Sequence, residues 1–389
     1  MASIRKRDGR PKPWEVLYRD DQDAQRSKSF RLKSEADAFR ASVEVDLRRS
    51  SYIDPDAGKV TLEDYAREWL DRQTFDAPTR VAMESRLRVH LYPTLGALQL
   101  RSIKASTVQG WVRGRSRDLA ASYVSLILGH LKAILSAAVD DKLIAANPAA
   151  SRSVKAPRSD RRKVVPWTVE QVQAIAAGHP DRYRAIPLVG AGTGLRQGEL
   201  FGIAVEDVDF LRHTLHVRTQ VRLINGHPVF APPKGGKVRE VPLPETVAVA
   251  LAEHLRAFPA VEVSLPWLDV DGEPTIRPLV FTGAKGGSLN KNPHTQRVWK
   301  PALEAAGIEY VPRQSGMHQL RHHYASVLLD AGVSIAALAS YLGHADPSVT
   351  LKVYSHMMPH SQDRARQAID AAHSARVGQV LAKGAQDGS

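Results

Sequence analysis

The 389-residue chain carries 54 lysines and arginines against 41 acidic residues, which gives a formal charge of +13. This excess predicts a polyanionic partner, either nucleic acid or an anionic membrane surface. The absence of cysteine excludes disulfides and thiolate metal sites and fits a reducing cytoplasm. We see no apolar run approaching about 18 residues and no signal-peptide segment, so the sequence predicts neither membrane insertion nor secretion.

Residues 1–59 form the first predicted module. Residues 1–33 hold ten basic and five acidic residues. Two β-prone stretches, WEVLYR and RSKSFRL, flank the turn-like DDQDAQ, and the helical segment SEADAFRASVEVDLRRS follows. The pattern predicts a small basic module in which strands precede a helix. The alternative is a solvated basic terminus.

Residues 60–150 carry helical patterns throughout. Thr61 precedes LEDYAREWLDRQ as a capping residue, APTRVAMESRLRVHLYPTLG follows, and AASYVSLILGHLKAILSAAVDDKLI is strongly amphipathic. We therefore expect a compact bundle of four or five helices. Residues 151–163 then hold six basic residues and one acidic residue. They predict a linker that is either only solvated or lies across a phosphate backbone.

Residues 164–365 combine helices with a β-rich insert. TVEQVQAIAAG and DRYRAIPLVGAGTG predict helices, whereas HTLHVRTQVRLI and HPVFAPPKGGKVREVPL alternate as strands do and contain the turns NGH and KGGK. The insert predicts an α+β, mainly helical catalytic domain with a small antiparallel sheet, followed by a tail at residues 366–389. The predicted fold class is thus multidomain: a β+α N-terminal module, an all-α bundle and this domain.

Several common catalytic motifs are missing from the sequence. It has no GxxxxGK[ST] phosphate loop, no GxGxxG between a strand and a helix, and no carboxylate cluster suited to magnesium. His318 and His322 have the i, i+4 spacing of zinc ligands, but Gln319 replaces the glutamate of a metalloprotease motif and Arg321 shares their helical face. We therefore expect no metal and no cofactor.

Five short segments together carry the residues of a phosphate site. The segments are GTGLRQGEL, PPKGGKVREVPL, HQLRHHYAS, LGH and VYSH. Two arginines, a lysine and two histidines suit a phosphate group, and a tyrosine offers a nucleophile. These residues are Arg196, Lys234, His318, Arg321, His344 and Tyr354.

The same segments, in this order, resemble the signature of the tyrosine recombinase (phage integrase) family. The resemblance covers residues 164 to 359 approximately and the helical domain before them. The basic N-terminal module is similar, more loosely, to the arm-site-binding module of phage-type integrases. The resemblance implies a phage or mobile-element integrase that cuts and rejoins DNA through a 3′-phosphotyrosyl intermediate.

The resemblance also implies the roles of the groups that move protons. Tyr354 would attack the scissile phosphate, although a free phenol has a pKa of about 10 and needs its proton accepted. His318 is expected to accept that proton, which requires hydrogen-bond reach to the tyrosine. Lys234, near the tip of the predicted hairpin, would protonate the departing 5′ oxygen. Lys237 in the same turn remains the alternative.

The other site residues would bind and orient the phosphate. Arg196 and Arg321 would clamp its non-bridging oxygens, and His344 would donate a further hydrogen bond. Glu199 is expected to orient its neighbours, or to be only a helix ion-pair partner. His322 matches the second histidine of the family's HxLRH box and is expected to be a buried polar group that contacts the catalytic residues rather than the phosphate.

A short helix after LGH is expected to carry the tyrosine. Asp346 suits its N-cap and Pro347 its first turn. Val349, Val353 and Met357 recur at i, i+4 and i+8 and predict the buried stripe, with Tyr354 about 100° off it. Tyr354 lies ten residues after His344, and whether it acts within its own subunit or in a neighbour stays open.

The implied partner is double-stranded DNA at core sites and at arm sites, without a membrane, in the cytoplasm of a bacterial host. A homotetramer is expected in the synapse, with an excisionase or a DNA-bending host factor as a further partner. The tail after Ser361 is expected to dock on a neighbouring protomer. The residues expected to contact DNA outside the catalytic site are Arg5, Lys6, Arg7, Arg152, Lys155, Arg158, Arg161, Arg162 and Lys163.

Two other functions fit part of the pattern. A topoisomerase of type IB shares the Arg, Lys, Arg, His and Tyr chemistry, but the basic N-terminal module favours the integrase. A non-catalytic DNA-binding regulator would explain the positive charge equally well. Such a protein would be expected to have lost a catalytic position, and none is lost here.

Overall fold

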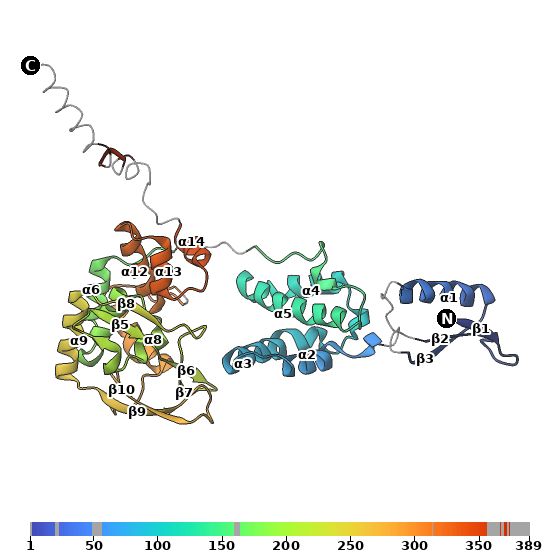
Figure 1. Cartoon of the computed structure of the whole chain (residues 1–389), viewed down its shortest axis with the longest axis horizontal. Coiled ribbons are helices and arrows are strands. Elements are labelled where there is room, and N and C mark those ends of the chain that lie inside the picture. Colours follow the sequence, from blue (N-terminus) through green and yellow to red (C-terminus); the bar gives the residue numbers. More distant parts are fainter. Residues whose placement is uncertain are drawn as a thin grey trace, which may run out of the picture. The chain divides into compact units, whose positions relative to one another are not determined.

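The computed structural model describes residues 2–19, 23–48, 57–158, 164–312, 314–355, 366, 369–371 and 373. Arg161, Arg162, Lys163, Met357 and the tail from residue 374 lie outside this set. The chain separates into two compact units, Met1–Arg161 and Arg162–Ser389 (Figure 1). Each unit is described by itself below.

The first unit begins with a three-stranded antiparallel sheet of order β1-β2-β3 and one helix, α1. The elements are β1 (Ser3–Lys6), β2 (Trp14–Arg19), β3 (Gln25–Phe30) and α1 (Lys33–Arg48). Val16 and Tyr18 alternate along β2 and pack with Ala36 and Val43 of α1 in a small core. This alternation accounts for the formation of β2. The short basic strand β1 was not predicted from the sequence.

The rest of the first unit is helical. Its longer elements are α2 (Leu62–Asp71), α3 (Ala77–Arg86), the π-helix η2 (Leu87–Gly96), α4 (Ala105–Arg115) and α5 (Ala121–Asp140), and its short turns are η1 (Ala57–Lys59), η3 (Leu100–Ser102) and η4 (Pro148–Ala150). Thr61 caps α2 by accepting from the Asp64 amide at 3.2 Å. By length and composition alone α5 could span a membrane. Its apolar residues are buried in the core of the helical bundle, which accounts for the apolar composition of α5.

The second unit is mainly helical. Its helices and helical turns are α6 (Val169–Ala177), η5 (Asp181–Tyr183), α7 (Ala185–Thr193), α8 (Gln197–Phe201), η6 (Val205–Asp207), α9 (Glu245–Ala257), α10 (Lys291–His294), η7 (Thr295–Trp299), α11 (Lys300–Ala305), α12 (His318–Asp330), α13 (Ile335–Leu342) and α14 (Pro347–Tyr354). α7 crosses α12 closely, because a Cβ on Gly190 would meet Leu320 at 2.8 Å. This close approach brings the C-terminal end of α7 beside the first turn of α12.

Three small antiparallel sheets complete the second unit. They join β4 (Val208–Asp209), β5 (Thr214–Val217) and β8 (Arg239–Pro242); β6 (Gln220–Ile224) and β7 (His227–Ala231); and β9 (Val261–Pro266) and β10 (Pro274–Leu279). The predicted NGH turn joins β6 to β7. The predicted KGGK hairpin is wrong, because β7 pairs with β6 and β8 pairs with β5. Pro232 and Pro233 follow β7 and have no amide hydrogen with which to extend a ladder.

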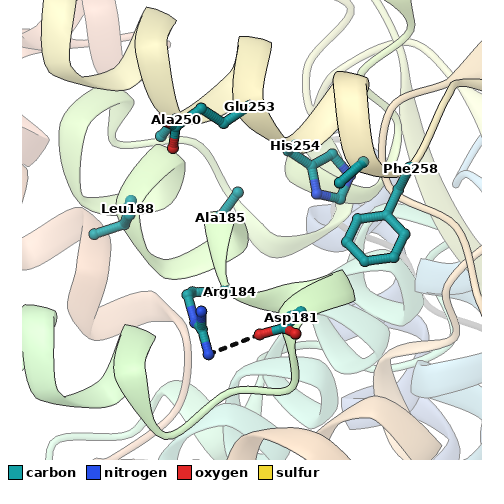
Figure 2. Close-up of a pocket in the computed structure, with 9 residues that line it drawn as sticks. Asp181, Arg184, Ala185, Leu188, Ala250, Glu253, His254 and Phe258 are labelled. Atoms are coloured by element: carbon teal, nitrogen blue, oxygen red, sulfur yellow. Dashed lines mark ion pairs between the residues drawn. The ribbon is translucent and has the colours of Figure 1, made fainter.

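A surface pocket of about 180 Å³ lies between the first turns of α7 and the C-terminal half of α9 (Figure 2). Its wall includes the ion pair between Arg184 and Asp181 at 2.7 Å and the Phe258 ring. His254 lines it as well and is bonded to the Val280 carbonyl oxygen at 3.0 Å. None of the residues predicted to form the phosphate site lines this pocket.

Candidate active site

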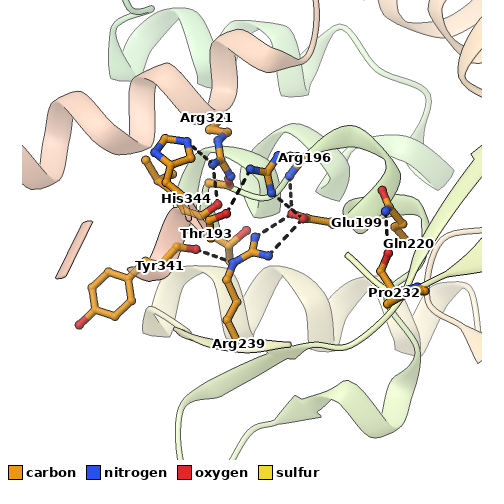
Figure 3. A network of polar contacts seen from close by, with 12 residues as sticks. Thr193, Arg196, Glu199, Gln220, Pro232, Arg239, Arg321, Tyr341 and His344 are labelled. Carbon is orange, nitrogen blue, oxygen red and sulfur yellow. Dashed lines mark hydrogen bonds and ion pairs between the residues drawn. The ribbon is translucent and has the colours of Figure 1, made fainter. Parts of the chain in front are cut away.

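Residues from four separate segments converge in the second unit (Figure 3). Arg196 precedes α8, Arg239 opens β8, Arg321 lies on α12, and His344 follows α13. Gly194 ends α7 with φ +65°, a left-handed conformation that glycine adopts without strain. Its carbonyl accepts from Arg321 Nη1 at 2.9 Å, so the glycine turn links two of these segments.

Three arginines donate to three successive carbonyls at the C-terminal end of α13. The pairs are Arg239 Nε with Tyr341 O at 2.7 Å, Arg321 Nη2 with Leu342 O at 2.5 Å, and Arg196 Nη2 with Gly343 O at 3.5 Å. The last carbonyls of a helix have no partner within it and carry the negative end of the helix dipole. They therefore hold three cations in place.

Glu199 is the acid of this cluster, and its carboxylate is fully buried. One oxygen accepts from Arg196 Nη1 at 3.0 Å and from Arg239 Nη1 at 3.1 Å, and the other accepts from the Arg196 amide at 2.9 Å and from Arg239 Nη2 at 2.7 Å. Burial acts to raise the pKa of Glu199, but the hydrogen bonds and charges of the two arginines outweigh it and lower the pKa. The carboxylate is therefore ionised.

Arg321 is buried, with 1% of its surface exposed. Burial and the charge of Arg196 lower its pKa to about 9, so it keeps its charge at neutral pH. Its Nη2 also donates to Nε2 of His344 at 2.9 Å. Because a guanidinium only donates, His344 uses Nε2 as an acceptor, and its Nδ1–H donates to Thr350 Oγ1 at 2.7 Å. Here His344 accepts from an arginine, whereas we expected it to donate to phosphate.

All three histidines of the site are neutral at pH 7. Burial, followed by the nearby cations, lowers the pKa of His318 and of His344 to about 4. Burial, followed by His318 and Arg321, lowers the pKa of His322 to about 4. A neutral imidazole has a nitrogen able to accept a proton, which leaves His318 and His322 as candidate bases, whereas both nitrogens of His344 are engaged with Arg321 and Thr350.

The Tyr354 hydroxyl lies 2.8 Å from Nδ1 of His322. The contact expected for His318 is thus made by His322, one helical turn later on α12, while the two histidine rings meet edge to face with centroids 4.8 Å apart. Burial raises the pKa of Tyr354 to about 12, although Arg321 and Arg196 act to lower it. The phenol is therefore protonated at neutral pH.

The buried face of α14 differs from the predicted valine stripe. Thr350 and Tyr354, which are i and i+4, are almost fully buried, whereas Val349 is 43% exposed. Val353 packs against the core only in part. The polar bonds of Thr350 and Tyr354 to histidines decide which face turns inward. The predicted N-cap is confirmed, since Asp346 accepts from the Ser348 amide at 2.8 Å.

Lys234 and Lys237 are exposed in the turn between β7 and β8. Gly235 and Gly236 within it have φ +81° and +69°. Neither lysine makes a hydrogen bond or an ion pair with another described residue. Within the described part of the chain, no group of three or more histidines or acids could hold a metal ion.

Comparisons with known proteins show which family the chain belongs to. The model of the phage integrase family matches residues 167–360. A tyrosine recombinase XerC-like protein of Caldanaerobacter subterraneus subsp. tengcongensis is 25% identical over 362 residues, which cover 87% of this chain and 90% of the relative. The integrase of Mycobacterium phage L5 is 25% identical over 331 residues, covering 82% and 84% respectively. The chain belongs to the tyrosine recombinase (phage integrase) family.

Two solved structures have the same fold as this recombinase. The Tn1549 transposon integrase in complex with a circular intermediate DNA aligns with a TM-score of 0.67 and 22% identity, over 80% of this chain and 99% of that one. A lambda integrase tetramer bound to a Holliday junction aligns with a TM-score of 0.56 and 16% identity, over 88% and 96%. These two likenesses show a shared fold. The family model and the curated relatives show that the protein is a site-specific recombinase of the phage or mobile-element type.

Six of the nine basic residues predicted to contact DNA belong to the described parts of the chain, where they lie in two places. In the N-terminal sheet, Arg5 and Arg7 both contact Glu15 at 2.7 Å, and Lys6 contacts Asp8 at 2.8 Å. These three cations are thus partly neutralised. Three further residues are exposed in the segment after the helical bundle: Arg152, Lys155 and Arg158.

Arg239 was not predicted from the sequence, although it lies in the same cluster as Arg196 and Glu199. It is 9% exposed and contacts both Glu199 and the end of α13. A signal for it is present in the sequence, because Arg239 and Val241 alternate with Glu240 and Pro242 and so occupy the buried face of β8. An arginine on the inward face of a strand requires a buried partner.

Proposed function

We propose that this recombinase cuts and rejoins duplex DNA at specific sites of a phage or another mobile element, with Tyr354 as the nucleophile. One chain of contacts carries the proposal. Arg321 donates to His344, His344 donates to Thr350, and Thr350 shares the buried face of α14 with Tyr354. These contacts tie the phenol to the arginine cluster through one turn of helix.

The proposed reaction exchanges one bond to phosphorus for another. The Tyr354 oxygen attacks the scissile phosphate, the P–O5′ bond breaks, and a 3′-phosphotyrosyl link forms. The phenolic proton moves to a histidine, and Lys234 or Lys237 protonates the departing 5′ oxygen. The 5′-hydroxyl of another strand can reverse the step, so strands are exchanged and rejoined rather than hydrolysed.

His322 is the proton acceptor that the contacts support best. Its Nδ1 lies 2.8 Å from the phenol, and its pKa of about 4 keeps the ring neutral at pH 7. His318 is the second candidate, since its ring stacks edge-on against His322 and its pKa is also about 4. A proton taken by either ring would be repelled by Arg321, which favours its later release.

Arg196 and Arg321 are proposed to bind the non-bridging oxygens of the phosphate. Two arginines, Arg196 and Arg239, pair with the Glu199 carboxylate, and Arg321 adds a third positive charge to the cluster. The excess of positive charge is one that a phosphate would offset. By analogy with one oxyanion-hole donor, each arginine would stabilise the transition state by about 2.7–4 kcal/mol. Glu199 would hold Arg196 in position.

The partners proposed for this recombinase are duplex DNA, further copies of the chain and accessory proteins. The solved complexes of a transposon integrase with DNA and of a lambda integrase tetramer with a Holliday junction support duplex DNA and a tetrameric synapse. An excisionase or a DNA-bending host factor would act on the same assembly, in the cytoplasm of the host. The exposed cations after the helical bundle, Arg152, Lys155 and Arg158, would contact phosphates and make binding salt-dependent.

A suicide DNA substrate with a nick beside the scissile phosphate of the cognate core site tests the proposal. Wild-type protein should form a denaturation-resistant adduct, and Tyr354→Phe should form none. An adduct with the phenylalanine variant would assign the nucleophile elsewhere. Relaxation of plasmids that lack the site would instead indicate a topoisomerase, and no adduct on any site would indicate a DNA-binding regulator.

A further inference from the structure

We propose that Arg239 is a positioning residue for DNA cleavage, which aligns Arg196 through Glu199 and fixes the turn that carries His344. This inference rests on the proposed function of the site. It is carried by the contacts of one buried guanidinium whose hydrogen-bond partners, Glu199 and Tyr341, lie on two separate segments (Figure 3).

All three nitrogens of the Arg239 side chain donate to protein atoms. Nε donates to the Tyr341 carbonyl at 2.7 Å, Nη1 to one oxygen of Glu199 at 3.1 Å, and Nη2 to its other oxygen at 2.7 Å. The side chain is 6% exposed, compared with 23% for that of Arg196. All three nitrogens of Arg239 are thus engaged with the protein, so the residue acts through its neighbours, and Arg196 is the more exposed of the two.

The carboxylate of Glu199 is shared equally between two arginines. Each oxygen accepts one hydrogen bond from Arg196 and one from Arg239. The bidentate pair with Arg239 fixes the plane of the carboxylate. That plane sets the direction of the Arg196 guanidinium. Without Arg239, Glu199 would lose two of these four donors and would pair with Arg196 alone. The Arg196 guanidinium would then rotate toward Glu199, and its attraction for the phosphate would weaken.

The second effect of Arg239 is on the turn between α13 and α14. A Cβ on Gly343 would lie 3.1 Å from three atoms of the Arg239 side chain, so the arginine packs against the glycine itself. Gly343 has φ +66° and directly precedes His344. Arg239 therefore fixes the position of this turn, both by packing against Gly343 and by its hydrogen bond to the Tyr341 carbonyl.

Lysine cannot replace Arg239 in this position. Its single ammonium nitrogen cannot contact both oxygens of Glu199 and the Tyr341 carbonyl in one plane. Arg239→Lys thus keeps the charge and removes the alignment. Arg277→Lys is the matched control, because Arg277 is also mostly buried and paired with two carboxylates, Asp207 and Glu206, outside the site.

The test is a kinetic double-mutant cycle on the suicide substrate with the full-length chain. Arg239→Lys should lower the single-turnover cleavage rate about 10²-fold, as expected for a misplacement of about 1 Å. Its affinity for the core site at fixed salt should not change. In an Arg196→Lys background, Arg239→Lys should cost clearly less than about 10²-fold, because Arg196 is already altered and only the effect on the turn before His344 remains. Arg277→Lys should leave cleavage unchanged in both backgrounds.

Two results would overturn the inference. One is a cleavage rate for Arg239→Lys equal to that of Arg277→Lys, and the other is a full, multiplicative loss in the Arg196→Lys background. If Arg239→Lys melts below the assay temperature, Arg239→Gln takes its place, and the same two results apply. If wild type forms the adduct and Arg239→Lys forms it just as fast, only this inference is contradicted. The lack of any adduct from wild type contradicts the proposed function.

Discussion

The Tyr354 hydroxyl lies against Nδ1 of His322, at 2.8 Å, rather than against His318. The two histidines are one turn apart on α12, so both belong to one face of that helix. The charge of Arg321 acts on both rings, but His318 also has Arg196 nearby, while His322 contacts the phenol. The two rings therefore occupy different environments although their pKa values are both about 4.

The first prediction separates these two histidines. His322→Gln should slow adduct formation about 10²–10⁴-fold if His322 accepts the phenolic proton, the usual range for a general base. His318→Gln should have the smaller effect. Single-turnover cleavage across pH 5 to 9 provides the measurement. A larger loss of cleavage rate in His318→Gln than in His322→Gln would indicate that His318 is the base.

The second prediction concerns stability in acid. The folded pKa of about 4 for His318, His322 and His344 lies below the ordinary value of 6.5, so the unfolded chain binds more protons between these values. The free energy of unfolding should therefore fall as pH drops from 6.5 to 4, by up to about 1.4 kcal/mol per pH unit for each histidine. Urea unfolding at several pH values measures this, and His322→Gln should flatten the curve. An unchanged slope would mean that His322 titrates normally when folded.

The third prediction contrasts the two phosphate-binding arginines. Arg196→Ala and Arg321→Ala should each lower the cleavage rate about 10²–10³-fold. Only Arg321→Ala should also destabilise the fold strongly, because it strands the buried acceptors on Gly194, Leu342 and His344. Thermal unfolding beside the cleavage assay checks both parts. Equal loss of stability in the two variants would contradict the burial argument.

The fourth prediction concerns the acid that protonates the leaving group. Lys234→Ala should slow cleavage of an ordinary phosphodiester. A substrate with a 5′-bridging sulfur, which leaves without a proton, should restore the rate. Lys237→Ala, in the same exposed turn, is the control and should behave as wild type on both substrates. Rescue of Lys237→Ala instead would transfer the role to that lysine.

The sequence identified most of the site because its motifs depend on local spacing. Arg196 and Glu199 are i and i+3 at a helix start, and the turn before His344 needs a glycine at φ +66°. Such short-range features appear directly in the residues. Their convergence with Arg321 depends on the close crossing of α7 and α12 at Gly190, which only the fold provides.

The parts that the sequence missed depend on contacts between distant segments. The inward face of α14 is chosen by Thr350 and Tyr354 bonding to histidines, and apolar periodicity alone favoured Val349. The KGGK segment was predicted to be a hairpin because its flanks alternate, but each flank pairs with a different strand. Arg239 was missed because its partners are 40 and 102 residues away in the sequence.

The burial of Tyr354 has a consequence for the protein between encounters with DNA. A phenol with 1% of its surface exposed and a pKa of about 12 is hidden from nitrating and iodinating reagents and from kinases, all of which need an accessible ring or hydroxyl. The single residue whose modification would end the proposed chemistry is thus chemically protected at rest. The same fold that is proposed to aim the nucleophile also preserves it.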